Sequence, residues 1–178
     1  MTREFIVYAC PTGAIAAQLA TYFQRSLTEC GSNAAHGYMP HCTLTGFFHD
    51  ELEAAPIYLK ALDDALNQAR SPQPNPAIAI TALTFQPAFH FLKLESDWVL
   101  RLMEDFRDRA RSDTRVDALR LKDWLHLSLA YEFPAEQYVQ LQRLAAEVVD
   151  PRSPAGWELR FYERHGDRSW TCYKTWAL

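Results

Sequence analysis

The sequence has no long hydrophobic run and no pair of closely spaced cysteines. No apolar stretch approaches the roughly 20 residues that cross a bilayer, so we expect no membrane partner. Residues 1–10 are typical of a strand rather than a signal peptide, because the apolar stretch is short and no small-residue cleavage pattern follows it. The four cysteines form no Cys-x-x-Cys pair, which argues against a zinc ribbon or a redox dithiol. We therefore expect a cytoplasmic protein with free, mostly buried thiols.

The chain also lacks an excess of positive charge. Its formal net charge is -4, which argues against binding to long duplex nucleic acid but allows a nucleotide or short RNA as substrate. Basic residues do occur in two regions, and the sequence does not tell whether they bind phosphate or form solvated surface. These residues are Arg115, Arg120, Lys122, Arg160, Arg164, Arg168 and Lys174.

The composition is that of a globular protein. With 178 residues and 48% hydrophobic side chains, we expect one domain over residues 1–178 with a sizeable core. Apolar residues recur with helical spacing in four segments, and β-branched or aromatic runs predict seven strands, while residues 71–76 break regular structure. The helices are expected within 15–27, 59–69, 99–110 and 138–148, and the strands over 4–9, 42–48, 77–85, 89–95, 125–131, 157–164 and 170–177.

The order of these elements approximately repeats. Each half of the chain contains a helix, then a strand, then a second helix and finally a pair of strands. Such an order predicts an α+β fold with two pseudo-repeated lobes, each an antiparallel sheet with outer helices. The two lobes would form a central cleft between their inner faces.

Two short motifs place a histidine two residues before a hydroxyl group. They are His41 with Thr43 and His126 with Ser128, and apolar residues flank both. On a strand, side chains two residues apart share one face and lie about 6.6 Å from each other. Each pair would therefore face the cleft, while Cys42 and Leu127 between them would face the core. Two imidazoles can transfer protons, and two hydroxyl groups can bind an anion between them.

The paired motifs, in residues 40–44 and 125–129, resemble those of the 2H phosphoesterase superfamily. Pro40 departs slightly from the pattern, because an aliphatic residue is usual there. Residues 40–48 and 125–133 look most like the phosphodiesterase domain of the TULA proteins, which carry ubiquitin-associated and SH3 domains. The resemblance covers most of the chain, and its LigT-like fold matches the two lobes expected above. The sequence looks less like the bacterial 2′-5′ RNA ligase branch of this superfamily, because that branch tends to place a basic residue shortly after the motif.

The resemblance implies metal-independent hydrolysis of a nucleoside 2′,3′-cyclic phosphate or a 2′-5′ linkage, without a cofactor. The two histidines would be general acid and base, since an unperturbed imidazole has a pKa near about 6.5. Thr43 and Ser128 would bind the non-bridging phosphate oxygens. Which of His41 and His126 is the base depends on how the substrate lies in the cleft.

Other residues are weaker candidates for substrate binding. Tyr38 and Trp170 could stack on a base, and His90 could contact the substrate. Tyr131 is expected to face the core, because strict alternation from His126 turns it away from the cleft. The three other histidines, in predicted loops and turns, are expected to be exposed to solvent; they are His36, His49 and His165.

Two further functions remain open at this point. A pseudoenzyme could bind a nucleotide or an RNA end in the same cleft without turnover. A metal could bind the histidines, but neither motif has a third ligand in a recognised spacing, and tetrahedral zinc needs three or four. We therefore expect no metal site.

Overall fold

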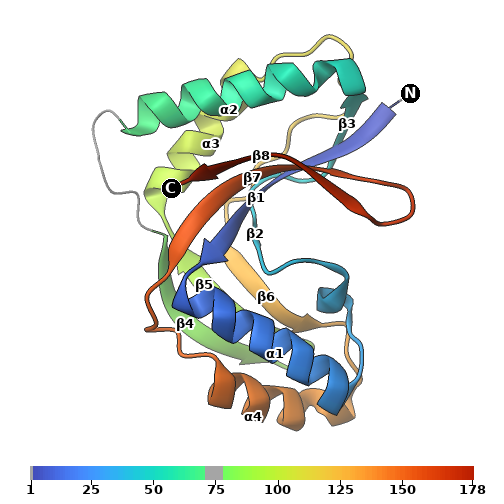
Figure 1. Ribbon diagram of the computed structural model, residues 1–178, viewed down its shortest axis with the longest axis vertical. Coiled ribbons are helices and arrows are strands. Elements are labelled where there is room, and N and C mark those ends of the chain that lie inside the picture. The colour runs from blue at the N-terminus through green and yellow to red at the C-terminus, as the bar shows by residue number, and fades with distance from the viewer. Residues whose placement is uncertain (1, 71–77) are drawn as a thin grey trace.

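The computed structural model describes residues 2–70 and 78–178 (Figure 1). These residues contain eight strands and four α-helices. The strands are β1 (Thr2–Thr12), β2 (Cys42–Thr43), β3 (Phe48–Glu51), β4 (Ala79–Gln86), β5 (Phe89–Glu95), β6 (His126–Tyr131), β7 (Gly156–Arg164) and β8 (Trp170–Ala177). The helices are α1 (Ala14–Cys30), α2 (Ala55–Arg70), α3 (Asp97–Arg109) and α4 (Tyr138–Val148), with short 3-10 helices η1 (Ala34–Gly37), η2 (Leu52–Ala54) and η3 (Ala135–Gln137).

The strands form an antiparallel sheet in the order β4-β5-β6-β2-β1-β7-β8, and β3 pairs with β1 beyond β2. Its two parts meet where β2 pairs with β6 at Cys42 and Leu127. One part is β4, β5 and β6, and the other contains β1, β2, β3, β7 and β8. Each part therefore contributes one of the two motif strands, side by side at the junction, which confirms the predicted α+β fold with two strand groups.

The two parts exchange elements between the halves of the sequence. The hairpin β4–β5 comes from the first half but pairs with β6, the second motif strand. The hairpin β7–β8 comes from the second half but pairs with β1. The helices also cross between the halves, since α2 packs on α3 and α1 packs on α4, and Figure 1 shows these pairs at opposite ends of the molecule.

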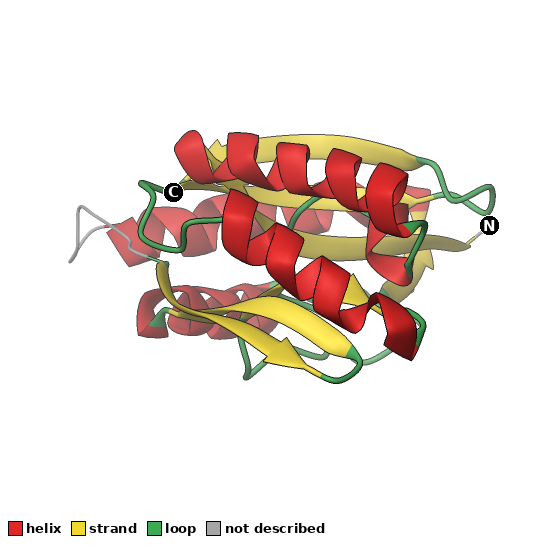
Figure 2. Cartoon of the chain, turned by 90° about the horizontal axis from the view of Figure 1, so that it is seen from below, coloured by secondary structure: helices red, strands yellow, loops and turns green. Residues whose placement is uncertain are grey.

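The two faces of β1 serve different purposes. Phe5, Val7 and Ala9 point into the main hydrophobic core, which includes buried residues from all four helices. Ile6 and Tyr8, which alternate with them, lie in a smaller apolar cluster on the opposite face. The helices thus cover one face of the sheet, and Figure 2 looks onto α1 and α4 in front of the strands. The uncovered face is free to form a cavity.

The predicted helices are confirmed, and their ends follow the expected chemistry. Ser96 caps α3, because its side chain accepts a hydrogen bond from the Val99 amide at 3.2 Å. Gly31 follows the last residue of α1 with φ 90°, a left-handed conformation that glycine adopts without strain. The predicted break at residues 71–76 lies outside the described residues. Within the described ranges, no helix combines the length and apolar character needed to span a membrane.

The strand predicted over residues 42–48 is interrupted, because regular pairing with β1 stops after Thr43 and resumes at Phe48. Tyr8 of β1 opposes Thr43, whereas Phe5 opposes Phe48, so the first-motif side has more residues than the β1 side between these pairs. The extra residues form a bulge between these two pairs. Thr45 stabilises the bulge, because its buried hydroxyl accepts a hydrogen bond from the Val7 amide at 3.0 Å.

Candidate active site

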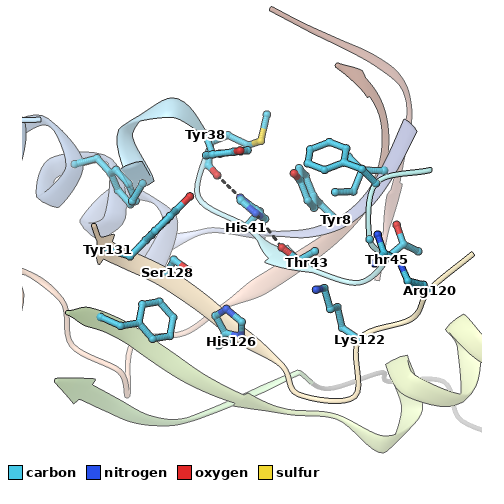
Figure 3. A pocket seen from close by; sticks show the side chains of 17 residues that line it. Tyr8, Tyr38, His41, Thr43, Thr45, Arg120, Lys122, His126, Ser128 and Tyr131 are labelled. Atoms are coloured by element: carbon cyan, nitrogen blue, oxygen red, sulfur yellow. Dashed lines mark hydrogen bonds between the residues drawn. The ribbon is translucent and has the colours of Figure 1, made fainter. Parts of the chain in front are cut away.

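A cavity of about 590 Å³ lies on the sheet face opposite the helices and is lined by both motifs (Figure 3). Thr43 belongs to β2, and His41 is the residue just before this strand. His126 and Ser128 belong to β6. Between them Cys42 and Leu127 are buried in the core, as strand alternation predicts. The structure therefore brings the four predicted motif residues to one cavity. Their catalytic roles stay a prediction.

His41 is held in one orientation by three contacts. Its Nδ1 donates a hydrogen bond to the Met39 carbonyl oxygen at 2.7 Å, and the Thr43 hydroxyl lies 3.1 Å from Nε2. Its ring lies over the Tyr8 ring, with centroids 3.9 Å apart. Burial lowers the pKa of His41 to about 4, the Met39 hydrogen bond opposes this, and His126 adds to the lowering. His41 is therefore uncharged near neutrality, with the Nε2 lone pair on the cavity side.

His126 has a similar aromatic support but fewer polar contacts. Its ring stacks on Trp124, with centroids 4.1 Å apart and planes 27° apart. Burial lowers the pKa of His126 below its usual value of 6.5, and the charge of Lys122 lowers it further. The Trp124 backbone raises the pKa of His126 and so partly offsets the effect of burial. Among the described residues, none lies at ordinary hydrogen-bond geometry from His126 Nδ1. An uncharged His126 thus faces His41 across the cavity.

The prediction that Tyr131 faces the core is wrong, because β6 contains a bulge. Ala130 opposes His90 on β5, and Ser128 opposes the next residue, Phe91, so Leu129 has no partner of its own. The extra residue resets the alternation. Leu129 and Ala130 are both fully buried, and Tyr131 lines the cavity with Ser128 (Figure 3).

The three candidate substrate contacts have different positions. Tyr38 lines the cavity, and its ring centroid lies 5.7 Å from that of His41. Trp170 packs against Tyr38 and Tyr8 and lines an adjoining groove rather than the cavity itself. His90 is not brought to the site. Its side chain is fully buried beside Phe85, Phe133 and Tyr138, on the other side of the sheet from Ser128.

Four further residues line the cavity, although the sequence alone did not assign them to the site. Tyr8 belongs to a continuous apolar run, and only the pairing of β1 with both β2 and β7 shows that alternate residues face a cavity. Phe89 begins β5 and was assigned to a hairpin only. Arg120 and Lys122 also line the cavity, and their spacing of two around Leu121 is the signal that could have selected them among the basic residues.

The three other histidines are not simply solvent-exposed. The backbone N–H of Asn33 donates a hydrogen bond to His36 Nδ1 at 3.0 Å, and His36 Nε2 lies 3.0 Å from the Ser26 hydroxyl. His49 Nδ1 donates to Asp117 at 2.5 Å, and His165 lies 2.8 Å from the Thr171 hydroxyl. These histidines thus have structural partners outside the cavity.

The cysteines are as expected, since three are buried thiols and Cys172 is exposed. In the described part of the chain, no group of three or more histidine, cysteine or acidic residues could hold a metal ion. The absence of a metal requirement stays a prediction that only an assay can test.

Comparison with known proteins gives relatives for almost the whole chain. No family model matches the sequence. Human ubiquitin-associated and SH3 domain-containing protein B is 32% identical over 167 residues, covering 92% of this chain and 25% of the relative. The ecdysteroid-phosphate phosphatase of Drosophila melanogaster is 30% identical over 197 residues, covering 91% of this chain and 26% of the relative. The chain therefore spans about a quarter of the length of the curated relatives it matches.

A search of solved structures gives the same fold. The structure of Escherichia coli LigT complexed with phosphate matches with a TM-score of 0.52, covering 99% of this chain and 98% of that chain, at 17% sequence identity. The LigT fold is consistent with the resemblance of the two motifs to the 2H phosphoesterase superfamily. In sequence, the homologues of the chain are the TULA proteins, which are the ubiquitin-associated and SH3 domain-containing proteins, and the ecdysteroid-phosphate phosphatases.

Proposed function

We propose that this chain is a phosphoesterase that hydrolyses nucleoside 2′,3′-cyclic phosphates or 2′-5′ phosphodiester linkages, with its two histidines as base and acid. The observation that carries the proposal is the pair of uncharged imidazoles, His41 and His126, at one cavity with a hydroxyl group beside each. Attack of water on a phosphodiester needs a base for the water and an acid for the leaving oxygen, and two imidazoles supply both. No metal ion is required for either proton transfer.

His41 is the base in this proposal. Its Nδ1 proton is committed to the Met39 carbonyl, so the tautomer is set and Nε2 can accept a proton from water. The Thr43 hydroxyl, now 3.1 Å from Nε2, lies where the attacking water would form its hydrogen bond. The base must be uncharged, and the lowered pKa of His41 keeps it so down to mildly acidic pH.

His126 is then the acid. It protonates the 2′ or 3′ oxygen as the bond from that oxygen to phosphorus breaks, while the hydroxide formed at His41 bonds to phosphorus. A phosphate monoester is the product, and the two histidines exchange protonation states. Bound phosphate is anionic, so it favours the protonated form of His126 that the acid role requires.

The hydroxyl groups and aromatic rings position the substrate. Thr43 and Ser128 can donate hydrogen bonds to the non-bridging oxygens, whose negative charge grows during the reaction. Tyr38 and Tyr131 line the same cavity, and their rings offer stacking surfaces for a base. The names of the relatives do not specify this reaction, because the segment matched is only 25% to 26% of each relative.

Hydrolysis assays test the proposal directly. Protein dialysed against EDTA is incubated with the four nucleoside 2′,3′-cyclic phosphates and with short 2′-5′ oligoadenylates, and the products are identified by phosphorus NMR. We expect turnover of at least one substrate class that survives chelation and disappears in His41→Ala and His126→Ala. Tight binding without turnover would instead support a nucleotide-binding protein. Activity that EDTA abolishes and zinc or manganese restores would overturn the two-histidine mechanism.

A further inference from the structure

The cavity is positively charged, although the chain as a whole has a formal net charge of -4. Two of the residues that line the cavity, Arg120 and Lys122, are basic, and no lining residue is acidic. The imidazoles and hydroxyl groups described above already serve one phosphate. The two cations therefore exceed what a single phosphodiester needs.

Backbone hydrogen bonds fix the segment from which both cationic side chains extend. Thr45 pairs with Leu121, the Gly46 amide donates to the Arg120 carbonyl at 2.8 Å, and the Lys122 amide donates to the Leu44 carbonyl at 3.0 Å. Residues 120–122 thus run antiparallel to the chain that follows the first motif. Leu121 packs against the main core, so strand alternation turns Arg120 and Lys122 to the cavity.

Neither cation is neutralised. Within residues 2–70 and 78–178, no carboxylate forms an ion pair with Arg120 or Lys122 at 4.0 Å or less. Asp117, which senses the charge of Arg120, is held instead by His49 at 2.5 Å. The positive charge of Lys122 reaches His126, whose imidazolium form it disfavours. The field at this end of the cavity is therefore available to an anion.

The cations and the aromatic rings lie on opposite sides of the histidines. Figure 3 shows Arg120 and Lys122 beyond Thr43, with Tyr38 and Tyr131 on the other side of the cavity. A substrate with its base on the tyrosines and its reacting phosphate at the histidines would extend toward the cations.

The groove on the tyrosine side is a poorer anion site. Its Arg164 is paired with Glu4 at 2.7 Å, and Glu132 shares the groove with Arg168. The carboxylates there compensate the positive charge, in contrast to the cavity, where Arg120 and Lys122 face no acidic residue.

Resting on the proposed function, we propose that Arg120 and Lys122 form a subsite for a second phosphate of the substrate. The preferred substrate is then a cyclic phosphate or 2′-5′ linkage in a molecule that carries another phosphate. Such a phosphate can come from a 5′-phosphorylated nucleotide or from the neighbouring linkage of a short oligonucleotide. A nucleoside cyclic phosphate with no second phosphate leaves the subsite empty.

Three substrates with the same reacting group test the subsite. They are adenosine 2′,3′-cyclic phosphate, its 5′-phosphorylated form and the dinucleotide ApA ending in a 2′,3′-cyclic phosphate. We expect the wild-type kcat/KM to be at least tenfold higher for one or both substrates with a second phosphate, and this ratio to fall toward one in the double variant Arg120→Gln/Lys122→Gln. The substrate that shows the preference identifies the source of the phosphate. Raising the salt concentration should reduce the ratio in the wild type, because ions screen exposed charges.

A matched control removes two positive charges elsewhere. Arg101 on α3 and Arg143 on α4 are exposed and do not line the cavity, so Arg101→Gln/Arg143→Gln should retain the substrate ratio. Circular dichroism and the thermal midpoint establish that each variant is folded. Equal loss of the ratio in this control would mean that overall charge, rather than the subsite, sets the preference, and would overturn the inference.

Different results would overturn the subsite and the proposed phosphodiesterase activity. If wild type hydrolyses all three substrates with equal kcat/KM, the phosphodiesterase remains and the subsite is wrong. If no substrate is hydrolysed, calorimetry with products still tests the subsite. Adenosine 2′,5′- and 3′,5′-bisphosphates should bind at least tenfold more tightly than the corresponding 2′- and 3′-monophosphates in wild type but not in the double variant, and equal affinities would overturn the subsite.

Discussion

The ring of Tyr8 lies against the ring of His41, with centroids 3.9 Å apart and planes 30° apart. Trp124 supports His126 in the same way, at 4.1 Å. The two supports reach the site differently, because Tyr8 is buried on the long strand β1, whereas Trp124 precedes β6 and is 44% exposed. Each histidine therefore has one polar side for the substrate and one aromatic side that limits rotation of the imidazole.

Replacing Tyr8 separates its ring from its hydroxyl group. Tyr8→Phe retains the stacking on His41, so we expect kcat to change by less than about threefold. Tyr8→Ala removes a buried ring, which should lower the free energy of unfolding by about 3 to 5 kcal/mol and reduce kcat more than KM changes. Urea unfolding and steady-state kinetics measure the two effects. A large loss in Tyr8→Phe would show that the hydroxyl group has a role of its own.

The losses of activity from replacing the two histidines should not be additive. Removing a general acid or base typically costs about 10² to 10⁴ in rate, so His41→Ala and His126→Ala should each lose activity by that order. The double variant should be little worse than either single variant, because acid and base act in one step. Steady-state kinetics on folded variants decides this point. A loss below about tenfold for either histidine would contradict the two-histidine mechanism.

The pH profile should be bell-shaped with an acidic optimum. The base His41 must be uncharged, so activity should fall below a pKa of about 4, and the acid His126 must be protonated, so it should fall above a pKa that is lower than 6.5. The dependence of kcat/KM on pH reports these values for the free enzyme. Lys122→Gln removes a charge that lowers the pKa of His126, so the alkaline limb should move to higher pH. An unmoved limb would assign it to another group.

Buried His90 should make the fold less stable in acid. Burial lowers its pKa to about 4 in the folded state, whereas the unfolded chain takes up the proton near 6.5. The stabilising effect of an uncharged His90 is therefore complete above pH 6.5 and is lost as the pH falls toward 4. In this window one histidine contributes a slope of up to about 1.4 kcal/mol per pH unit.

The matched test uses His90→Leu, which places an apolar side chain that does not titrate beside Phe85 and Phe133. Urea unfolding of both proteins between pH 4 and 7.5 should give a shallower pH dependence for the variant. Buried His41 contributes in the same direction, so part of the slope should remain. Identical slopes in the two proteins would mean that His90 has the same pKa in the folded and unfolded states.

The sequence was sufficient for the features that depend on periodicity. The helices follow from apolar spacing, and the two motifs follow from the alternation of faces on a strand, which correctly buries Cys42 and Leu127. The exchange of hairpins between the two halves did not follow, because strand pairing depends on contacts between distant segments. The cavity positions of Arg120 and Lys122 did not follow either, since they depend on the pairing of Leu121 with Thr45.

Tyr131 shows how one local irregularity changes a functional prediction. Regular alternation would bury its side chain, but the bulge at Leu129 adds one residue and turns Tyr131 to the cavity. Stacking of a base on an aromatic ring is typically worth about 1 to 3 kcal/mol. Tyr131→Ala should therefore raise KM by about fivefold to 160-fold for a nucleotide substrate, whereas Tyr131→Phe retains the ring and should change KM little.

A deletion tests the bulge itself. Removing Leu129 would restore regular pairing between β5 and β6, with Ser128 and Tyr131 then two residues apart on the cavity face, so the deletion variant should keep the wild-type KM if it folds. Because that variant also loses a fully buried leucine, Leu129→Ala is the control, since it loses the side chain but keeps the residue count. The control should be less stable in urea yet keep the wild-type KM. A raised KM in Leu129→Ala would mean that packing beneath the strand, rather than the register, positions Tyr131.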